Sequence, residues 1–277
     1  MKATLGGGLR GLLFALMLVG GTAAFLAFAL ALNGYQLTQE GTARRLLERS
    51  LAALTDLDAA LPALQDALRE QAQQEQGEAI VVPDFPLPVS VSREEAVSLE
   101  GQALRQRLLT DGSRVLYRQG TSALLSDPEA RRRLESTSMP WALEKGLDLI
   151  TQDTHRRLLI AMVALGIVAG LLLLPPLVMV PNLWGKLALL GGVLLVASLP
   201  SLAAALGARF FLRAAQGDAD PFVHQLLQVG VDAMTIPVRN YLALSALGSG
   251  LLLVAAAMVW AAPRRGVTAL TGEEDAA

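Results

Sequence analysis

The sequence predicts an all-α integral membrane protein with four transmembrane helices and a mostly helical extracytoplasmic domain between the first and second of them. Three observations support this fold class. The chain of 277 residues is 53% hydrophobic, with a mean hydropathy of +0.44. Its apolar residues are concentrated in four segments without Asp, Glu, Lys, Arg or His, namely 11–32, 158–180, 187–206 and 241–262. Each has the length of about 20 residues that a helix needs to span a bilayer.

These segments divide the chain into nine parts. In order, we predict a cytoplasmic N-terminus at 1–10, the first span at 11–32, an extracytoplasmic helical domain at 33–157, the second span at 158–180, a cytoplasmic turn at 181–186, the third span at 187–206, an extracytoplasmic segment with an interfacial helix at 207–240, the fourth span at 241–262 and a cytoplasmic tail at 263–277. The cytoplasmic parts are too short to hold a catalytic domain.

The first apolar segment combines features of a signal peptide and of a membrane anchor. Lys2 and Arg10 form a basic start, and Ala29-Leu30-Ala31 resembles the small-residue motif before a cleavage site. The apolar segment nevertheless exceeds the roughly 7–15 residues expected of a secretory signal core. We therefore expect an uncleaved signal anchor, with a cleaved signal peptide as the alternative.

The basic residues in the short flanks predict that both termini lie in the cytoplasm. This arrangement places five basic residues inside, at Lys2, Arg10, Lys186, Arg264 and Arg265, against three outside, at Arg209, Arg213 and Arg239. The arginines of 33–157 are not counted, because segments longer than about 60 residues cross largely regardless of their charge.

Within 33–157, a leucine repeat predicts a helix from Thr42 to Gln76. Its a and d positions are Leu47, Leu54, Leu57, Leu61, Leu64 and Leu68, with Ser50 and Gln71 in the two polar positions. Such a narrow seam has to pack on another helix, either inside this domain or in an intermolecular coiled coil. Pro62 predicts a kink or the start of a second helix, because it removes an amide donor.

The remainder of this domain predicts one extended strip and three further helices. Prolines at 83, 86 and 88 favour an extended or polyproline-like strip over 78–91, which serves as a connector or as a strip that a partner recognises. Ser92 and Glu95 form a capping box that opens a helix through roughly Tyr117. Ser126 and Glu129 open another, and a last helix begins near Met139.

No residues are predicted as catalytic, cofactor-binding or metal-binding. Cysteine is absent, and no nucleotide-binding, hydrolase or zinc-protease motif is found. Pairs such as Glu94-Glu95 and Asp56/Asp58 are expected on exposed helical faces. Arg131-Arg132-Arg133 is a solvated face or, alternatively, an anion site.

The two histidines are given structural roles. His155, beside Arg156 and Arg157, is expected at the membrane surface. His224, with Asp218, Asp220 and Asp232, has the residue types of a metal site. However, Asp220 followed by Pro221 is also a helix start, and Phe222, Leu226, Leu227 and Met234 give that helix an apolar face. We favour an interfacial helix on the outer leaflet.

The spans contain no Asp, Glu, Lys, Arg or His, which disfavours a proton pump, a voltage sensor or a retinal protein. Pro175 and Pro176 are interpreted as a kink that closes the second span before the chain reverses at Pro181-Asn182. Small-residue faces at Gly166 with Gly170, at Gly191-Gly192 and at Ala246 with Gly250 predict close helix packing.

Together these features predict a non-catalytic membrane protein that acts as an interaction, assembly or scaffold component through 33–157. The expected partners are membrane lipid and a protein bound by that domain. A net charge of −2 argues against nucleic acid. The arginine-rich, alanine-rich composition suggests a bacterial cell membrane protein.

Two alternatives are a ligand-sensing membrane protein with a separate signalling partner and a transport subunit. One span, a large outside domain and three further spans resemble the topology of permease subunits in the ABC systems that include the cell-division and macrolide-export permeases. That resemblance implies a cytoplasmic ATPase partner, for which the turn at 181–186 offers little surface.

Overall fold

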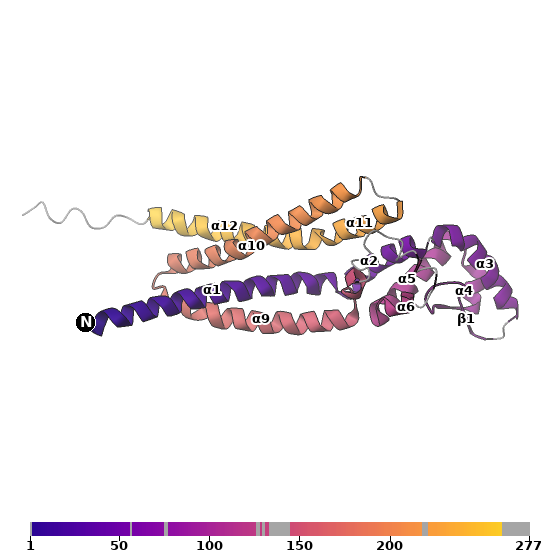
Figure 1. Ribbon diagram of the computed structural model, residues 1–277, viewed down its shortest axis with the longest axis horizontal. Helices are drawn as coiled ribbons and strands as arrows, with labels where there is room; N and C mark the ends of the chain where they lie inside the picture. Colours follow the sequence, from indigo (N-terminus) through magenta and orange to yellow (C-terminus); the bar gives the residue numbers. More distant parts are fainter. Residues whose placement is uncertain are drawn as a thin grey trace, which may run out of the picture. The chain divides into compact units, whose positions relative to one another are not determined.

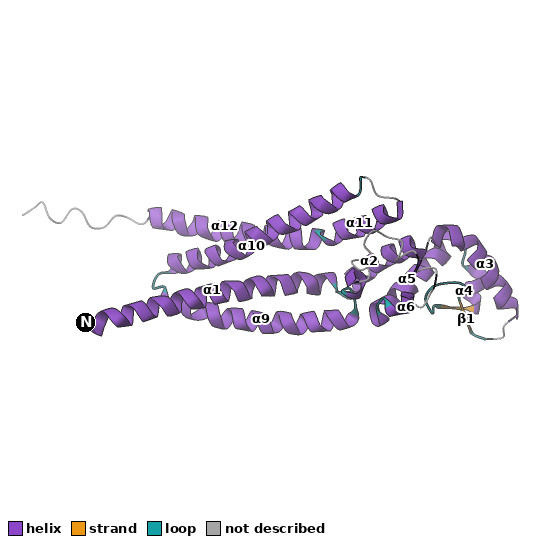
Figure 2. Cartoon of the chain, in the orientation of Figure 1, coloured by secondary structure: helices purple, strands orange, loops and turns teal. Residues whose placement is uncertain are grey.

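The computed structural model describes residues 2–55, 57–74, 77–125, 128, 131–132, 145–217 and 221–261. Its helices (Figures 1 and 2) are α1 (Lys2–Leu37), α2 (Glu40–Thr55), α3 (Leu57–Gln74), α4 (Arg93–Ser98), α5 (Gly101–Gln119), α6 (Ser122–Leu125), α9 (Gln152–Met179), α10 (Leu183–Ala215), α11 (Pro221–Ala233) and α12 (Thr235–Ala261). Two short strands, β1 (Ala79–Val81) and β2 (Ser90–Ser92), complete the described elements.

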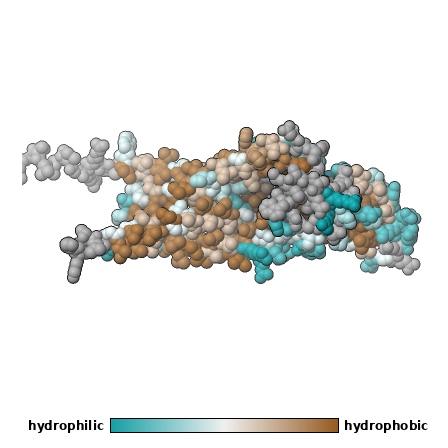
Figure 3. All heavy atoms as spheres, in the orientation of Figure 1, coloured by the Kyte–Doolittle hydropathy of each residue, from teal (hydrophilic) through white to brown (hydrophobic). Residues whose placement is uncertain are grey.

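The all-α class and the four membrane helices are confirmed. Helix makes up 86% of the structure. Four stretches are long and apolar enough to cross a membrane: they lie in α1, in α9, in α10 and over α11 and α12. Their apolar side chains point outward; Leu171, Val178 and Leu253, for example, are each about two-thirds exposed. Figure 3 shows hydrophobic residues gathered over these long helices. Apolar surface on this scale is typical of helices that span a bilayer.

The chain separates into two compact units. One contains Met1–Leu26, Gly166–Leu202 and Asn240–Ala277, and the other contains Ala27–Leu165 and Ala203–Arg239. The long helices pass from one unit to the other. At 1.5 Å per residue α1 is about 54 Å long, well beyond the roughly 30 Å of a bilayer core. The last residues of α1, from Ala27 to Leu37, accordingly belong to the second unit.

In the first unit, glycines allow two helices to touch through their backbones. A Cβ atom built on Gly191 of α10 would lie 2.8 Å from the carbonyl oxygen of Gly248 of α12. The buried Ser198 joins the same two helices through a hydroxyl–hydroxyl hydrogen bond of 2.8 Å to Ser245. The small-residue prediction is right for Gly191. It is wrong for its neighbour Gly192, where a Cβ atom would meet no other group within 4 Å.

Gly170 and Gly250 are likewise open on the side where a Cβ would lie. The glycine that Gly191 meets is Gly248, which was not among the small residues identified from the sequence. Sequence spacing identifies small residues but not the face that meets a neighbour, because that face is set by the crossing of the two helices.

The prolines of α9 lie inside the helix, which continues beyond Pro176 to Met179. The next helix begins at Leu183, so the chain reverses within residues 180–182 rather than over 181–186. Asn182 starts α10 by accepting a hydrogen bond from the Gly185 amide at 2.6 Å. This side-chain cap explains the early start of the helix.

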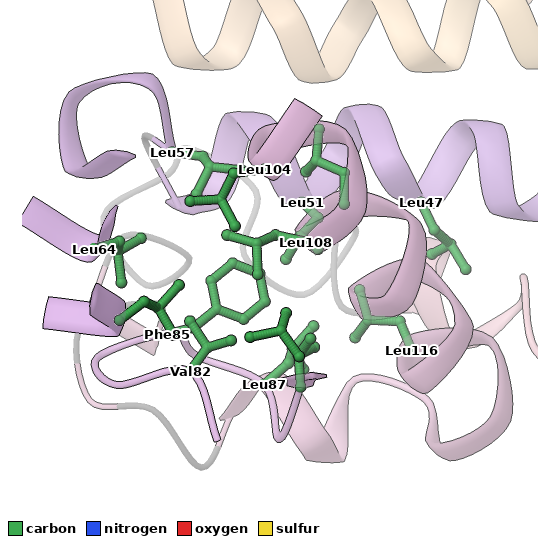
Figure 4. Packing of buried hydrophobic residues seen from close by; sticks show 14 of the residues in the cluster. Leu47, Leu51, Leu57, Leu64, Val82, Phe85, Leu87, Leu104, Leu108 and Leu116 are labelled. Carbon is green, nitrogen blue, oxygen red and sulfur yellow. The ribbon is translucent and has the colours of Figure 1, made fainter. Parts of the chain in front are cut away.

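The helical domain of the second unit has its own hydrophobic core (Figure 4). Leu51 of α2, Leu64 of α3 and Leu108 of α5 point toward one another and toward Phe85 from the segment between the strands. The leucine seam contributes Leu47, Leu54, Leu57, Leu64 and Leu68 to this core, and Leu61 packs at its margin. The seam is thus used within the domain, and it is not free to form an intermolecular coiled coil.

Two helix boundaries differ from the predictions. Where the sequence predicts one helix over Thr42–Gln76, the structure describes α2 to Thr55 and α3 from Leu57, and Pro62 lies inside α3. The helix opened by Ser92 ends at Ser98 instead of near Tyr117, and α5 begins at Gly101, which has a positive φ of 51°. Glycine adopts this left-handed conformation without the steric cost that other residues pay, so the chain bends here.

The capping box itself is confirmed. The Glu95 amide donates to the Ser92 hydroxyl at 3.2 Å, and the Ser92 amide donates to the Glu95 carboxylate at 3.0 Å. The second of these hydrogen bonds, helped by Arg107, lowers the pKa of Glu95. A lowered pKa means that this carboxylate stabilises the fold at neutral pH and loses that effect as the pH falls through its folded-state pKa.

The segment 78–91 forms a small sheet that was not predicted from its residues. β1 and β2 pair antiparallel with Ile80 opposite Val91, and both of these side chains are buried. The three prolines lie between the strands, where they interrupt no ladder hydrogen bond. The helices predicted from Ser126 and from Met139 fall largely outside the described residues.

Candidate functional site

The second unit contains an apolar cavity of about 470 Å³. Its walls come from the end of α1, one face of α2, the turn before α9, the start of α9 and one face of α11. The lining residues are Gly34, Leu37, Thr38, Leu46, Ser50, Leu54, Gly146, Leu147, Leu149, Ile150, Thr154, Leu158, Leu226, Val229, Gly230, Ala233 and Met234. The volume lies within the roughly 300–1,000 Å³ of small-molecule sites.

Helical spacing explains which residues face this cavity. On α11, Leu226, Val229, Gly230 and Ala233 follow one another at intervals that place them on one face. On α2, Leu46, Ser50 and Leu54 do the same. Gly230 leaves room for the side chain of Leu212 on α10. A Cβ atom built on Gly230 would lie 3.3 Å from Cδ1 of Leu212.

The sequence suggested that the apolar face of α11 lies on lipid. In the structure, α11 also contacts another part of the protein. It packs against α2, with Leu226 and Val231 buried. An ion pair between Arg49 of α2 and Asp232 of α11 joins the two helices at the surface. Asp232 also accepts a hydrogen bond from Gln228 at 3.2 Å. Of the apolar residues that were assigned to the bilayer, Leu226 and Met234 line the cavity instead.

The side-chain polar groups of the lining are three hydroxyls, on Thr38, Ser50 and Thr154. Thr154 shares a hydrogen bond of 3.0 Å with Thr151, and Thr38 is bound as described below. Among the lining residues that the structure describes, none is a carboxylate or an imidazole. The described lining is accordingly suited to an apolar ligand, with the three hydroxyls as its side-chain polar contacts.

A polar cluster fixes the end of α1 next to this cavity. The Thr38 hydroxyl lies 3.1 Å from Nδ1 of His155, at the start of α9. The imidazole ring stacks on Tyr35 of α1, with ring centroids 4.6 Å apart. The Tyr117 hydroxyl of α5 donates to the Thr38 carbonyl oxygen at 3.0 Å. Burial raises the pKa of Tyr117, and the negative charge of Glu40 adds to this effect.

His155 was predicted to lie at the membrane surface with its side chain toward lipid headgroups. Its ring is instead half-buried against α1, whereas Arg156 and Arg157 are exposed. Sequence reasoning did not find Tyr35, Thr38 or Tyr117, because each is an ordinary residue whose partner lies far along the chain.

Asp148 holds the turn that forms another wall of the cavity. Its carboxylate accepts hydrogen bonds from the Thr121 amide at 3.1 Å and from the Thr121 hydroxyl at 2.5 Å. This pairing ties the turn at 145–150 to the end of α5 and the start of α6. Leu147, one residue earlier, is buried in the domain core.

The residues weighed for metal binding are not brought together in the part of the chain that the structure describes. His224 is exposed and lies near the Gln216 carbonyl oxygen, and Asp232 is paired with Arg49. Asp218 and Asp220 lie outside the described residues. Among the residues that were placed, no group of three or more His, Asp or Glu side chains is arranged to hold a metal ion.

The other charged residues considered from the sequence have surface positions. Glu95 pairs with Arg107, and Asp58 pairs with Arg105 at 2.6 Å. Glu94 is exposed, as are Arg131 and Arg132, while Asp56 and Arg133 lie outside the described residues.

The apolar cavity is thus the candidate site that the geometry favours. Comparison of this chain with protein-family models, curated proteins and solved structures gives no match.

Proposed function

We propose that this chain is a non-catalytic membrane protein that binds an apolar ligand in the cavity of its second unit and acts as a ligand sensor. The observation that carries the proposal is the cavity itself, in whose described lining hydroxyls are the only side-chain polar groups. A space of this size would ordinarily be filled by side chains, because protein interiors are close-packed.

The position of the cavity suits a sensor that reports to the membrane. Its walls include the C-terminal end of α1 and the N-terminal end of α9, and both helices contain a membrane-spanning segment. The Tyr35–His155 stack and the Thr38–His155 contact tie these two helices together beside the cavity. A ligand that changes the packing of Leu37 or Leu158 would therefore act directly on two spans. A signalling partner would read that change.

Occupancy can be tested with a photoreactive long-chain alcohol and the full chain in lipid nanodiscs. We expect the probe to label peptides of α2, because Leu46, Ser50 and Leu54 line the cavity although α2 is not a membrane span. Ala233→Phe should remove most of this labelling by filling the cavity. Gln225→Phe, on the exposed face of the same helix, should not.

A second cavity variant guards against misfolding of the first. Gly146 lines the cavity, and a Cβ atom built on it meets no other group within 4 Å. The ring of Gly146→Phe therefore has space there. Labelling of α2 that persists in both cavity variants, or that never occurs in the parent chain, would remove the basis for this function.

We further propose that the helical domain is extracytoplasmic and that both termini are cytoplasmic, in a bacterial cell membrane. The basic residues at the chain ends support this orientation. The chain has no cysteine, so single cysteines report on one position each. We expect a membrane-impermeant maleimide to label Gln106→Cys on intact cells, and Lys2→Cys only after lysis. The reverse pattern would invert the proposed orientation.

A protein-binding role for the domain is the second candidate, and one surface favours it. Val81 of β1 and Val97 of α4 are 61% and 55% exposed, and their two elements contact each other. Exposed apolar side chains next to a short sheet are suited to a protein partner. Such a partner would make the chain an assembly or scaffold component, held in the bilayer by its spans.

Affinity purification in mild detergent tests this second candidate. We expect a stable partner to copurify with the parent chain and to be lost from Val81→Asp/Val97→Asp. Recovery of the lone chain would contradict an assembly role. A transport role has no comparable support, because the link between α9 and α10, residues 180–182, offers an ATPase almost no surface.

A further inference from the structure

We propose that the cavity binds an uncharged lipid whose single polar group, a hydroxyl or carbonyl oxygen, forms a hydrogen bond with the hydroxyl of Ser50. This inference rests on the proposed ligand-binding function and adds the chemical class of the ligand. At Ser50 three observations coincide: a polar side chain, burial in the cavity lining, and the lack of a protein partner.

Ser50 takes the place of an apolar residue in the leucine seam of α2. It occupies the seam position between Leu47 and Leu54, which are both 1% exposed in the domain core. Ser50 itself is 3% exposed, and it lines the cavity. A leucine at this position would fill part of the space, so the small hydroxyl residue helps to keep the cavity open.

The hydroxyl of Ser50 is not used within the protein. A serine or threonine hydroxyl in a helix can donate to the carbonyl oxygen four residues earlier. Thr22, Thr38 and Thr55 form this hydrogen bond, at 2.7, 2.9 and 2.8 Å. The Ser50 hydroxyl forms no hydrogen bond with another residue that the structure describes. A buried hydroxyl without a partner is costly, so a ligand that supplies the partner binds more tightly.

The other two hydroxyls of the lining are already engaged. Thr154 donates to the carbonyl oxygen of Asp148 at 3.3 Å. Thr38 lies 3.1 Å from Nδ1 of His155 and also donates within its own helix. Among the described lining residues, Ser50 is therefore the hydroxyl that is free to bind a ligand. One free hydroxyl matches a ligand with one polar group.

The lining also favours an uncharged ligand over a charged one. Its described residues are glycines, aliphatic residues, one methionine and the three hydroxyl residues, so none of them carries a charge. A buried charge without a counter-ion costs far more than a buried hydroxyl or carbonyl group. Leu158 in the cavity wall is also the first residue of the charge-free segment 158–180 of α9. The helix that forms this wall thus continues into a span, where uncharged lipids are available.

The test compares three photoreactive probes of equal chain length, a hydrocarbon, an alcohol and an alkyl sulfate, with the full chain in nanodiscs of neutral lipid. We expect the alcohol to label α2 peptides at a concentration about two- to tenfold lower than the hydrocarbon, which corresponds to one hydrogen bond. The alkyl sulfate should label them least. Ser50→Ala should remove the difference between alcohol and hydrocarbon.

Thr55→Ala provides the matched control and should preserve this difference. It removes a hydroxyl of the same helix that donates to the Leu51 carbonyl oxygen and is not among the lining residues. Ser50→Ala should also leave the melting temperature of the full chain in detergent unchanged, because the hydroxyl has no partner to lose. A lowered melting temperature would show that the fold uses this hydroxyl, and it would overturn the inference.

The labelling outcomes separate the inference from the function on which it rests. Preference for the alcohol that is lost in Ser50→Ala and kept in Thr55→Ala supports the inference. Preference that survives Ser50→Ala reflects the depth of the probes in the bilayer and overturns the role of Ser50. Equal labelling by alcohol and hydrocarbon, blocked by Ala233→Phe, overturns the hydrogen bond while the ligand-binding function stands. Strongest labelling by the alkyl sulfate overturns the uncharged class. Absence of α2 labelling by every probe overturns both the ligand class and the cavity function.

Discussion

Replacing Leu108 by Ala is expected to lower the free energy of unfolding of the helical domain by about 2–5 kcal/mol. Leu108 is fully buried and points into the centre of the core from α5, toward Leu51 and Phe85 (Figure 4). Truncation removes apolar contacts and leaves a cavity that its rigid neighbours cannot close. Domains of this size are stable by only about 5–15 kcal/mol, so the loss is a large fraction of the total.

Hydrogen–deuterium exchange of the full chain measures this effect at the domain. Amides of α2 and α5 that open only on global unfolding should lose protection by about 30-fold or more, because each 1.4 kcal/mol corresponds to a factor of ten. Gln106→Ala, an exposed position on the same helix, should leave their protection nearly unchanged. Equal effects of the two substitutions would mean that the Leu108 side chain of α5 does not stabilise the core.

The sequence was most informative where the physical signal is local. Charge-free segments of about 20 residues identify membrane helices, because each ionisable side chain in the hydrocarbon is costly. The capping box of Ser92 and Glu95 was likewise predictable from the sequence, since both partners lie within one helical turn. The leucine seam correctly identified core residues, because its spacing places them on one face of α2 and α3.

Helix ends and the small sheet were less predictable. The expected helix is divided where Leu99 and Glu100 are extended and Gly101 has a positive φ, and the sequence does not distinguish a tolerated glycine from such a break. The pairing of Ile80 with Val91 was not expected, since the prolines between them made 78–91 resemble a strip without hydrogen-bonded partners. Pairing depends on the turn that brings the strands together, which is a property of the whole segment.

The candidate site could not be derived from the sequence. Its residues come from α1, α2, α9 and α11, which are far apart along the chain, and almost all are apolar. Such residues carry no motif, and on α11 they resembled a lipid-facing surface. The contact between Thr38 and His155 depends on the meeting of two helices that are separated by the whole helical domain. Local patterns contain no information on such a meeting.

Substituting Gly248 by Leu is expected to force α10 and α12 apart. A Cβ on Gly248 would lie 3.0 Å from the carbonyl oxygen of Gly191, and this atom belongs to the backbone. A backbone atom cannot rotate away as a side chain does, so the helices themselves must separate. Overpacking of this kind costs about 1–3 kcal/mol or more, and it strains the neighbouring Ser198–Ser245 hydrogen bond.

Two nearby glycines provide matched controls for this substitution, because Gly192 of α10 and Gly250 of α12 have no other group within 4 Å of a built Cβ. Trp184 and Trp260 lie on the same two helices, so tryptophan fluorescence of the full chain in detergent can follow their thermal separation. We expect Gly248→Leu and Gly191→Leu to lower the melting temperature by several degrees, while Gly192→Leu and Gly250→Leu leave it almost unchanged. Similar losses at all four positions would show that leucine is unfavourable for reasons other than the close backbone approach. A loss confined to Gly191 and Gly248 would establish that α10 and α12 meet through these two residues.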